Sequence, residues 1–235
     1  MKPYYDKDGI TIYCGDCREI LPKLDLHGIP LLLTDPPYGV KLDTHYKSNQ
    51  RGPLAGCNDY PRVYGDDKPF DPSFLMGFDR VCLWGANYYA DKLPPQGKWL
   101  VWDKRDGIAI NDQADCELAW CKGASGNVPR IFRHLWNGML KDSERDQRRC
   151  HPTQKPIALM KWCMDQFYAY PIIIDPFMGS GTTLVAAKQL GRKCIGIEIE
   201  EKYCQIAVER LRQSVMDLTV RPDEVLKSQN SMEEK

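Results

Sequence analysis

The chain has 235 residues, which fits one α/β domain with loop insertions, and 43% of them are hydrophobic, which is enough for a substantial core. Its 32 basic and 32 acidic residues give a formal net charge of +0, so a polyanion would have to be bound by a local basic surface. The 10 cysteines are scattered, which favours free thiols in a reducing cytoplasm over a disulfide scaffold. The first residues contain no apolar signal segment, and no apolar run approaches the length of a membrane span. We therefore expect a cytoplasmic protein without a membrane partner.

Cys14 and Cys17 form the one CxxC pair of the sequence. A structural zinc site needs a second pair of Cys or His ligands at a matching spacing, and the sequence does not supply one. We therefore expect no bound metal.

Strand and helix patterns alternate along the chain. Short apolar or alternating runs predict strands at residues 9–14, 29–34, 81–84, 98–102, 116–121, 172–174 and 194–197. Helical spacing predicts helices at residues 17–26, 157–168, 182–190 and 201–216. Residues 40–72 and 122–150 lack periodicity and are predicted to be long loops, and the polar residues 222–235 are predicted to be disordered.

This alternation predicts one α/β domain over residues 1–221, with the two long loops as insertions. We expect a mostly parallel, twisted sheet with helices on both faces and one antiparallel strand at an edge. Residues 116–121 alternate in polarity, which is typical of a strand at a sheet edge.

The segment from Asp175 to Thr183 follows an apolar strand and leads into a helix, and it carries glycines at 179 and 181. Glycines permit a tight turn and the close approach of a ligand, and the free amides of a helix start suit an anionic group. Glu198 ends the next strand, where dinucleotide-binding folds place an acid on ribose hydroxyls. The pattern predicts a nucleoside-like cofactor.

Three other interpretations fit this segment less well. A phosphate-binding P-loop would need a lysine before its Ser or Thr, but Gly181 is followed by Thr182. A dinucleotide fingerprint would need a small residue where Leu184 stands. A glycine-rich turn without a ligand is disfavoured by Glu198 and by the second motif.

The second motif, Asp35-Pro36-Pro37-Tyr38, follows the apolar run Leu31–Leu33. An exocyclic amine of adenine or cytosine is nearly planar and must become tetrahedral to accept a methyl group. Two acceptors aimed at its N–H groups favour that geometry and stabilise the developing positive charge. The Asp35 carboxylate and the Pro36 carbonyl can be these acceptors, and Tyr38 can stack on the base, which is worth roughly 1–3 kcal/mol. The alternative is a proline-rich turn that merely ends the strand.

The chain resembles DNA amino-methyltransferases of the permuted beta class, in which the acceptor motif precedes the cofactor motif. Five segments carry the resemblance, in the family's order and over nearly the whole chain: Tyr13–Asp16, Asp35–Gly39, His151–Pro156, Asp175–Thr183 and Gly196–Glu198. The resemblance implies a Rossmann-like class I methyltransferase fold and S-adenosyl-L-methionine as the methyl donor. Compact chains of this type often come from phages or prophages.

The resemblance also implies residue roles. It places Phe177 and Gly179 against the methionine part of the donor, Glu198 on the ribose and Asp16 near the donor's adenine. It places the turn at Lys155 and Pro156 near the methionine carboxylate. The further cofactor-binding candidates in the glycine motif are Asp175, Ser180, Gly181, Thr182 and Thr183. An acceptor motif that begins with Asp is more usual for adenine N6 than for cytosine N4.

A base in a duplex cannot reach such a pocket, so it would have to be flipped out of double-stranded DNA. The two long loops carry the candidate DNA contacts: Lys41, Arg51, Arg130, Arg133, Arg148 and Arg149. Basic and aromatic side chains alternate in the second loop, which suits contacts with the DNA backbone and bases. The alternative is a solvated loop whose charges are partly neutralised by nearby acids.

The sequence therefore predicts an enzyme that methylates adenine N6 in double-stranded DNA, acting as a monomer or weak homodimer in a bacterial cytoplasm. Cytosine N4 is the main alternative substrate. RNA or protein-amide methylation and a catalytically silent binding module are further alternatives. A cytosine carbon-5 enzyme is disfavoured because it would typically use a Cys after Pro, and no Pro-Cys pair occurs.

Overall fold

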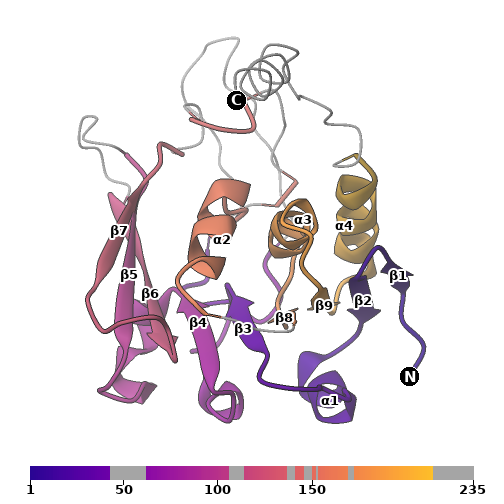
Figure 1. The fold of residues 1–235 in the computed structure, drawn as a ribbon, viewed down its shortest axis with the longest axis horizontal. Helices are drawn as coiled ribbons and strands as arrows, with labels where there is room; N and C mark the ends of the chain where they lie inside the picture. The colour runs from indigo at the N-terminus through magenta and orange to yellow at the C-terminus, as the bar shows by residue number, and fades with distance from the viewer. Residues whose placement is uncertain are drawn as a thin grey trace, which may run out of the picture.

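The computed structural model describes residues 1–42, 62–105, 114–136, 141–145, 150–151, 153–168 and 172–213. Within these residues a single 9-stranded sheet forms (Figure 1). In spatial order its strands are β1 (Tyr5–Lys7), β2 (Ile10–Cys14), β9 (Cys194–Glu198), β8 (Ile173–Asp175), β3 (Leu31–Thr34), β4 (Arg80–Trp84), β6 (Cys116–Lys122), β5 (Lys98–Asp103) and β7 (Arg130–Arg133).

The strands that precede the motifs lie together in the middle of this sheet. β2, β9, β8, β3 and β4 run parallel, and all four residues of β3 are buried, as expected for a strand covered on both faces. β3 pairs with β8, and β2 pairs with β9 with Ile10 opposite Cys194. The two motif strands are therefore neighbours, and the strand before Asp16 lies beside the strand that ends at Glu198.

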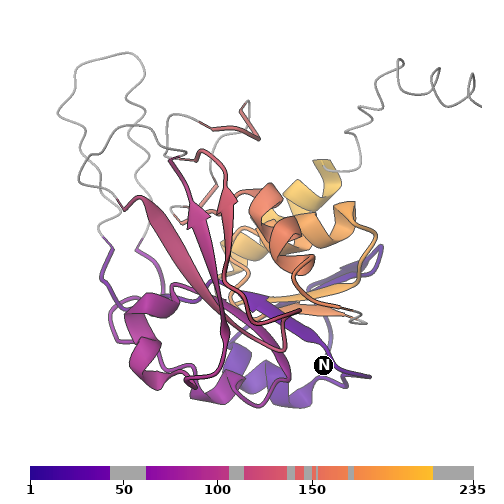
Figure 2. The same cartoon turned by 60° about the vertical axis from the view of Figure 1, so that its left-hand side comes forward.

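Helices cover both faces of the sheet. α2 (Ile157–Met164), α3 (Thr182–Gln189) and α4 (Glu201–Gln213) lie side by side on one face, whereas α1 (Cys17–Ile20) and the 3-10 helix η3 (Ala86–Lys92) lie on the other (Figures 1 and 2). The core divides accordingly, because Leu31 and Leu33 pack with α2 and α3 while Leu32 packs with residues of η3. The predicted Rossmann-like α/β fold is confirmed.

Two further 3-10 turns complete this second face. Asp16 is the N-cap of α1, and its side chain accepts a hydrogen bond of 2.8 Å from the amide of Arg18. The helix continues as η1 (Leu21–Lys23), because Pro22 cannot extend an α-helix there. η2 (Ser73–Leu75) contributes the fully buried Leu75 to the core.

Some boundaries differ from the prediction. Residues 116–121 are not an edge strand, because β6 pairs antiparallel with β4 on one side and β5 on the other, and the antiparallel edge strand is β1. The predicted loop 122–150 contains β7. α1 and α2 are shorter than predicted, ending at Ile20 and Met164. Most of loop 40–72 and the tail from residue 214 lie outside the described residues.

None of the helices that the structure describes has both the length and the apolar character needed to cross a bilayer.

Candidate active site

The carboxyl ends of the central strands open onto a cavity of about 980 Å³. This is at the upper end of the volumes typical of ligand pockets, so there is room for a nucleoside and a second planar group. Of the predicted site residues, those that line it are Asp16, Asp35, Pro36, Tyr38, Lys155, Phe177, Gly179 and Glu198. The acceptor motif, which begins at Asp35, and the cofactor motif, which begins at Asp175, therefore share one cavity.

One half of this cavity has the features of a nucleoside site. Glu198 accepts hydrogen bonds from the amides of Gly179, at 3.0 Å, and Glu200, at 2.9 Å, which fixes its carboxylate at the end of β9. Burial raises the pKa of Glu198, although these amides act in the opposite direction. Asp16 stands at the end of the neighbouring strand, and Phe177 packs edge-on against Phe70 with ring centroids 5.6 Å apart. Two acids beside an apolar wall suit ribose hydroxyls and a flat ring.

The other residues of the glycine motif support this half of the cavity. Asp175 accepts hydrogen bonds from the Thr34 hydroxyl, at 2.6 Å, and from the amide of Phe177, at 3.2 Å, and so ties β8 to β3. Burial raises the pKa of Asp175 to about 6. A small adjoining pocket of about 50 Å³ is lined by Asp175, Ser180, Thr182 and Thr183.

Two predicted cofactor residues line neither of these cavities. Gly181 has a φ of +80°, and a Cβ built on it would lie 2.7 Å from the Cβ of Ala207, so it permits close packing of the turn against α4. Pro156 is the N-cap of α2.

The other half of the cavity is formed by the acceptor motif. The Tyr38 hydroxyl donates a hydrogen bond to Oδ1 of Asp35. The Tyr38 ring stacks on the exposed Tyr88, with centroids 5.0 Å apart and an interplanar angle of 17°. Gly85 makes this position accessible, because a Cβ there would lie 1.9 Å from the Tyr38 ring. Tyr38 is thus an aromatic wall beside Asp35, as a base-stacking role requires.

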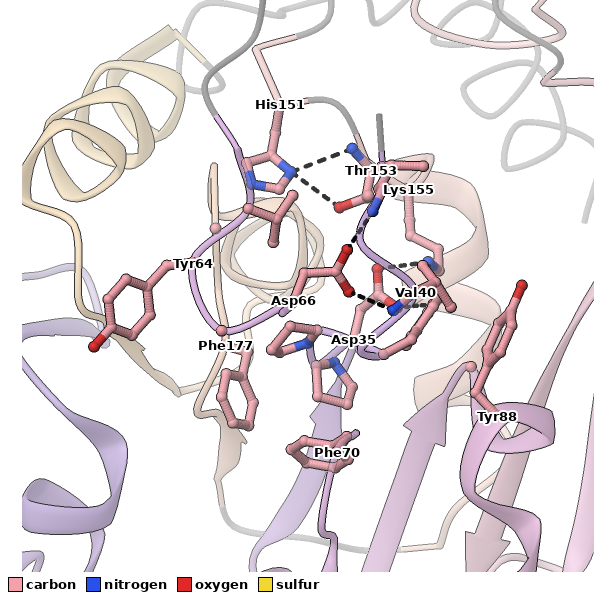
Figure 3. A pocket seen from close by; sticks show the side chains of 18 of the residues that line it. Asp35, Val40, Tyr64, Asp66, Phe70, Tyr88, His151, Thr153, Lys155 and Phe177 are labelled. Atoms are coloured by element: carbon pink, nitrogen blue, oxygen red, sulfur yellow. Dashed lines mark hydrogen bonds and ion pairs between the residues drawn. The ribbon is translucent and has the colours of Figure 1, made fainter. Parts of the chain in front are cut away.

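Lys155 is paired with carboxylates of the chain itself. Its Nζ lies 2.5 Å from Oδ2 of Asp35, 3.0 Å from Oε2 of Glu117 and 3.2 Å from the Tyr38 hydroxyl. Figure 3 shows the side chains of Asp35 and Lys155 pointing toward one another, with His151 and Phe177 on one side of them and Tyr88 on the other. Lys104 binds the second oxygen of Glu117 at 2.9 Å.

Asp35, Glu117, Lys155 and Lys104 form a partly buried charge cluster of two carboxylates and two ammonium groups, in which Lys155 is the most buried. Burial raises the pKa of Asp35, with Lys155 opposing and Glu117 adding to the shift. Although burial alone would raise the pKa of Glu117, Lys155 and Lys104 lower it to about 2. Burial disfavours the charge of Lys155, but Asp35 and Glu117 raise its pKa. Lys155 therefore stays charged between its two carboxylates.

Asp66 holds the turn that follows Tyr38. Its carboxylate accepts hydrogen bonds from the amides of Gly39, at 2.8 Å, Val40, at 3.2 Å, and Leu42, at 2.7 Å. Asp66 is buried although it lies in a predicted loop. Sequence reasoning missed both Asp66 and Glu117, because neither belongs to a local motif and each acts on residues far away in the chain.

His151 lines the cavity beside Gly179. Its Nδ1 is 3.0 Å from the Thr153 hydroxyl, and its ring meets the Tyr203 ring at a centroid distance of 4.6 Å. Burial lowers the pKa of His151 to about 4, and the charges of Lys155 and Lys202 act in the same direction. The imidazole is therefore neutral at physiological pH, in agreement with a structural role for this residue.

The predicted DNA contacts are placed only in part. Arg133 is exposed and lies 3.8 Å from Asp103, at the carboxyl end of β5 and near the cavity. Arg133 is the last residue of β7, and the exposed Arg130 is the first, roughly 10 Å away along that strand. Lys41 is exposed beside the Asp66 turn. Arg51, Arg148 and Arg149 lie outside the described residues.

Comparison with known proteins agrees with this geometry. Residues 101–209 match the family described as DNA methylase. The type II methyltransferase M2.LlaDCHI of Lactococcus lactis subsp. cremoris is 43% identical, over 90% of this chain and 93% of that protein.

Two solved structures share the fold. The M1.HpyAVI complex with S-adenosylmethionine is 26% identical, with a TM-score of 0.51 over 86% of this chain and 100% of that one. The cytosine-N4-specific PvuII DNA methyltransferase is 15% identical, with a TM-score of 0.58 over 96% of this chain and 93% of that one. The second of these likenesses concerns the fold alone.

Proposed function

This chain belongs to the DNA methylase family of N6/N4 amino-methyltransferases, and on that premise we propose that it methylates adenine N6 at a specific sequence in double-stranded DNA. S-adenosyl-L-methionine is the methyl donor. Cytosine N4 is the second candidate acceptor, because the matching family covers both N6 and N4 amino-methyltransferases.

The observation that supports the proposal is the shared cavity. Its nucleoside half offers Glu198, Asp16 and the apolar Phe177, which fit the ribose, the adenine and the flat surfaces of the donor. Gly179 has a φ of +49°, and a Cβ on it would be 3.7 Å from His151, so the absence of a side chain keeps this wall open. The chain's residues therefore fit S-adenosyl-L-methionine.

The donor supplies a methyl group on a positively charged sulfur. The chain's own groups act on the acceptor. The Asp35 carboxylate and the Pro36 carbonyl accept hydrogen bonds from the two N–H groups of the amine. These hydrogen bonds direct the lone pair of the nitrogen out of the plane of the base. Both oxygens stabilise the positive charge that develops on the nitrogen. Tyr38 supports the ring of the flipped base.

DNA binding is proposed to involve the edge of the sheet that carries β7. Arg133 pairs with Asp103, and the next residue, Lys104, lines the cavity, so Arg133 is placed to contact a phosphate of a DNA strand with a flipped base. Because the chain is neutral overall, the salt dependence of DNA binding would come from local basic residues such as Arg133.

One assay tests the proposed reaction. The protein is incubated with donor carrying a labelled methyl group and with a mixture of duplex DNA, RNA and protein, and the DNA is digested to nucleosides. The proposal expects label in N6-methyladenine. Label in N4-methylcytosine would favour the second candidate. Label in RNA or protein alone, or no label with donor binding intact, would contradict the proposal.

Replacing Glu198 with alanine is expected to weaken donor binding about 10- to 100-fold, because hydrogen bonds to a charged group are each worth about 1.5–3 kcal/mol. Isothermal titration with S-adenosyl-L-methionine measures the effect. Glu201→Ala, which removes an exposed acid at the start of α4, is the matched control. An unchanged dissociation constant in a folded Glu198→Ala variant would remove Glu198 from the donor site.

A further inference from the structure

We propose that Lys155 and Glu117 are positioning residues for methyl transfer: Lys155 holds Asp35 as a charged acceptor with one oxygen reserved for the substrate amine, and Glu117 anchors Lys155 in that place. The inference rests on the proposed function, because it assigns a role within the same site. It departs from the resemblance, which implies that Lys155 lies near the donor's carboxylate.

The contacts of Lys155 leave it no donor for another ligand. An ammonium group has three N–H donors. The three acceptors within hydrogen-bond distance of Nζ are Asp35, Glu117 and the Tyr38 hydroxyl, at 2.5, 3.0 and 3.2 Å. The side chain of Lys155 is only 6% exposed, so it cannot turn to solvent without breaking these contacts. Lys155 is thus committed to the acceptor half of the cavity.

The two oxygens of Asp35 differ in how firmly they are held. Oδ2 is bound by the fixed ammonium of Lys155, which is anchored by a second carboxylate. Oδ1 is bound by the hydroxyl of Tyr38, a half-buried residue whose ring stacks on the exposed Tyr88. The Tyr38 hydroxyl can leave more easily than Lys155. Oδ1 is therefore the oxygen that becomes available to an N–H of the substrate.

The charges explain why both Lys155 and Glu117 are needed. A buried carboxylate without a cation nearby tends to take up a proton, and a protonated Asp35 would offer an O–H donor where an acceptor is required. Lys155 opposes this protonation. If Asp35 were its only carboxylate partner, the Lys155 ammonium would repel the positive charge that develops on the substrate amine. Glu117 balances that ammonium, and Lys104 in turn balances Glu117.

Asp35 is surrounded by charged or titratable groups from several elements, and the test has to separate them. They are Lys155 before α2, Glu117 on β6, Tyr38 in the acceptor turn, Asp175 on β8 and Tyr89 in η3. The pKa of Asp175 is determined chiefly by its burial and by hydrogen bonds from Thr183, Thr34 and the Phe177 amide. Changes at Lys155 and Glu117 therefore report on Asp35 rather than on Asp175.

The experiment compares Lys155→Met and Glu117→Gln with the wild type in single-turnover methylation across pH. Lys155→Met is expected to lower the rate about 100-fold at neutral pH, as the loss of one preorganised group does, and to move the acidic limb of the pH profile to higher pH. Glu117→Gln is expected to move that limb to lower pH, because the charge of Glu117 raises the pKa of Asp35. Lys155→Arg is expected to restore part of the lost rate.

Three controls make the outcome decisive. Affinity for S-adenosyl-L-methionine is expected to stay within about 3-fold of the wild type. Lys188→Met removes another part-buried lysine, paired with Asp8, and is expected to leave the pH profile unchanged. Carboxyl carbon NMR titration of Asp35, assigned with Asp35→Asn, follows the same two shifts without relying on activity.

Opposite shifts of the acidic limb, or of the Asp35 titration, support the proposal. An unchanged profile in both variants would overturn it, and so would a loss of donor affinity greater than 10-fold in Lys155→Met, which would place Lys155 on the donor. If Lys155→Met does not fold, an unchanged Asp35 titration in Glu117→Gln still overturns it. A wild-type protein that methylates no DNA would instead refute the proposed function.

Discussion

Asparagine in place of Asp35 is expected to lower the rate of methyl transfer about 100- to 1000-fold, the range seen when one preorganised electrostatic group is removed from an active site. The side chain keeps its size, but it loses the charge that stabilises the developing positive charge. One of its two oxygens also becomes an NH₂ group. That group would face either the ammonium of Lys155 or the incoming amine, and both are donors.

The affinity for S-adenosyl-L-methionine is expected to change little in this variant, because Glu198 and Asp16 occupy the other half of the cavity. Single-turnover methylation and isothermal titration measure the two effects separately. Asp67→Asn makes the same chemical change at an exposed residue of the cavity rim and serves as the control. Loss of donor binding in a folded Asp35→Asn protein would show that Asp35 acts on the cofactor instead.

Methionine in place of Arg210 is expected to lower the free energy of unfolding by about 3–5 kcal/mol, the cost of breaking a buried charge pair from one side. Arg210 is 8% exposed on α4, and its guanidinium donates to the Ser180 carbonyl, at 2.7 Å, and to the hydroxyls of Ser180 and Thr182, each at 3.1 Å. Its second nitrogen lies 3.8 Å from Glu144. The substitution leaves a buried carboxylate and a buried carbonyl without these donors.

Urea unfolding measures this effect, and donor affinity is expected to fall with it because Arg210 holds the turn after Gly179. Arg212→Met, two residues further along the same helix and exposed, is the matched control. Burial raises the pKa of Glu144, with the Ile157 amide and Arg210 opposing it. The double variant with Glu144→Gln is therefore expected to recover part of the lost stability. A loss below about 1 kcal/mol in Arg210→Met would contradict the structural role given to this residue.

The central strands and the shared cavity could be predicted from the sequence for a physical reason. β3 and β8 are buried on both faces, so their sequences are short apolar runs. The acceptor motif directly follows β3, and the cofactor motif begins at the end of β8. Parallel strands bring their carboxyl ends to one edge, so motifs that follow neighbouring parallel strands meet there even when they lie far apart in sequence. The observed pairing of these strands follows from that rule.

The parts that could not be predicted depend on contacts between distant residues. β7 has the sequence Arg-Ile-Phe-Arg and exposed arginines at both ends, so it lacks the apolar signal of a strand. β6 resembles an edge strand in its first half, but Ala119, Trp120 and Cys121 are buried in succession because strands flank it on both sides.

Within the site, the partner of Lys155 could not be read from its own motif. Asp35 lies 120 residues earlier in the chain, and Glu117 belongs to a strand with no motif. The sequence identified the residues that face the cavity, whereas the pairing of their charges required the fold.

The convergence of the two motifs on one nucleobase amine is tested most directly by a structure of the protein with a donor analogue and a DNA duplex that contains the methylated site. We predict a flipped base whose exocyclic nitrogen lies about 3 Å from Oδ1 of Asp35 and from the Pro36 carbonyl oxygen, with Lys155 still on Oδ2. A base bound elsewhere, or an amine that points away from Asp35 while the donor lies against Glu198, would contradict the account.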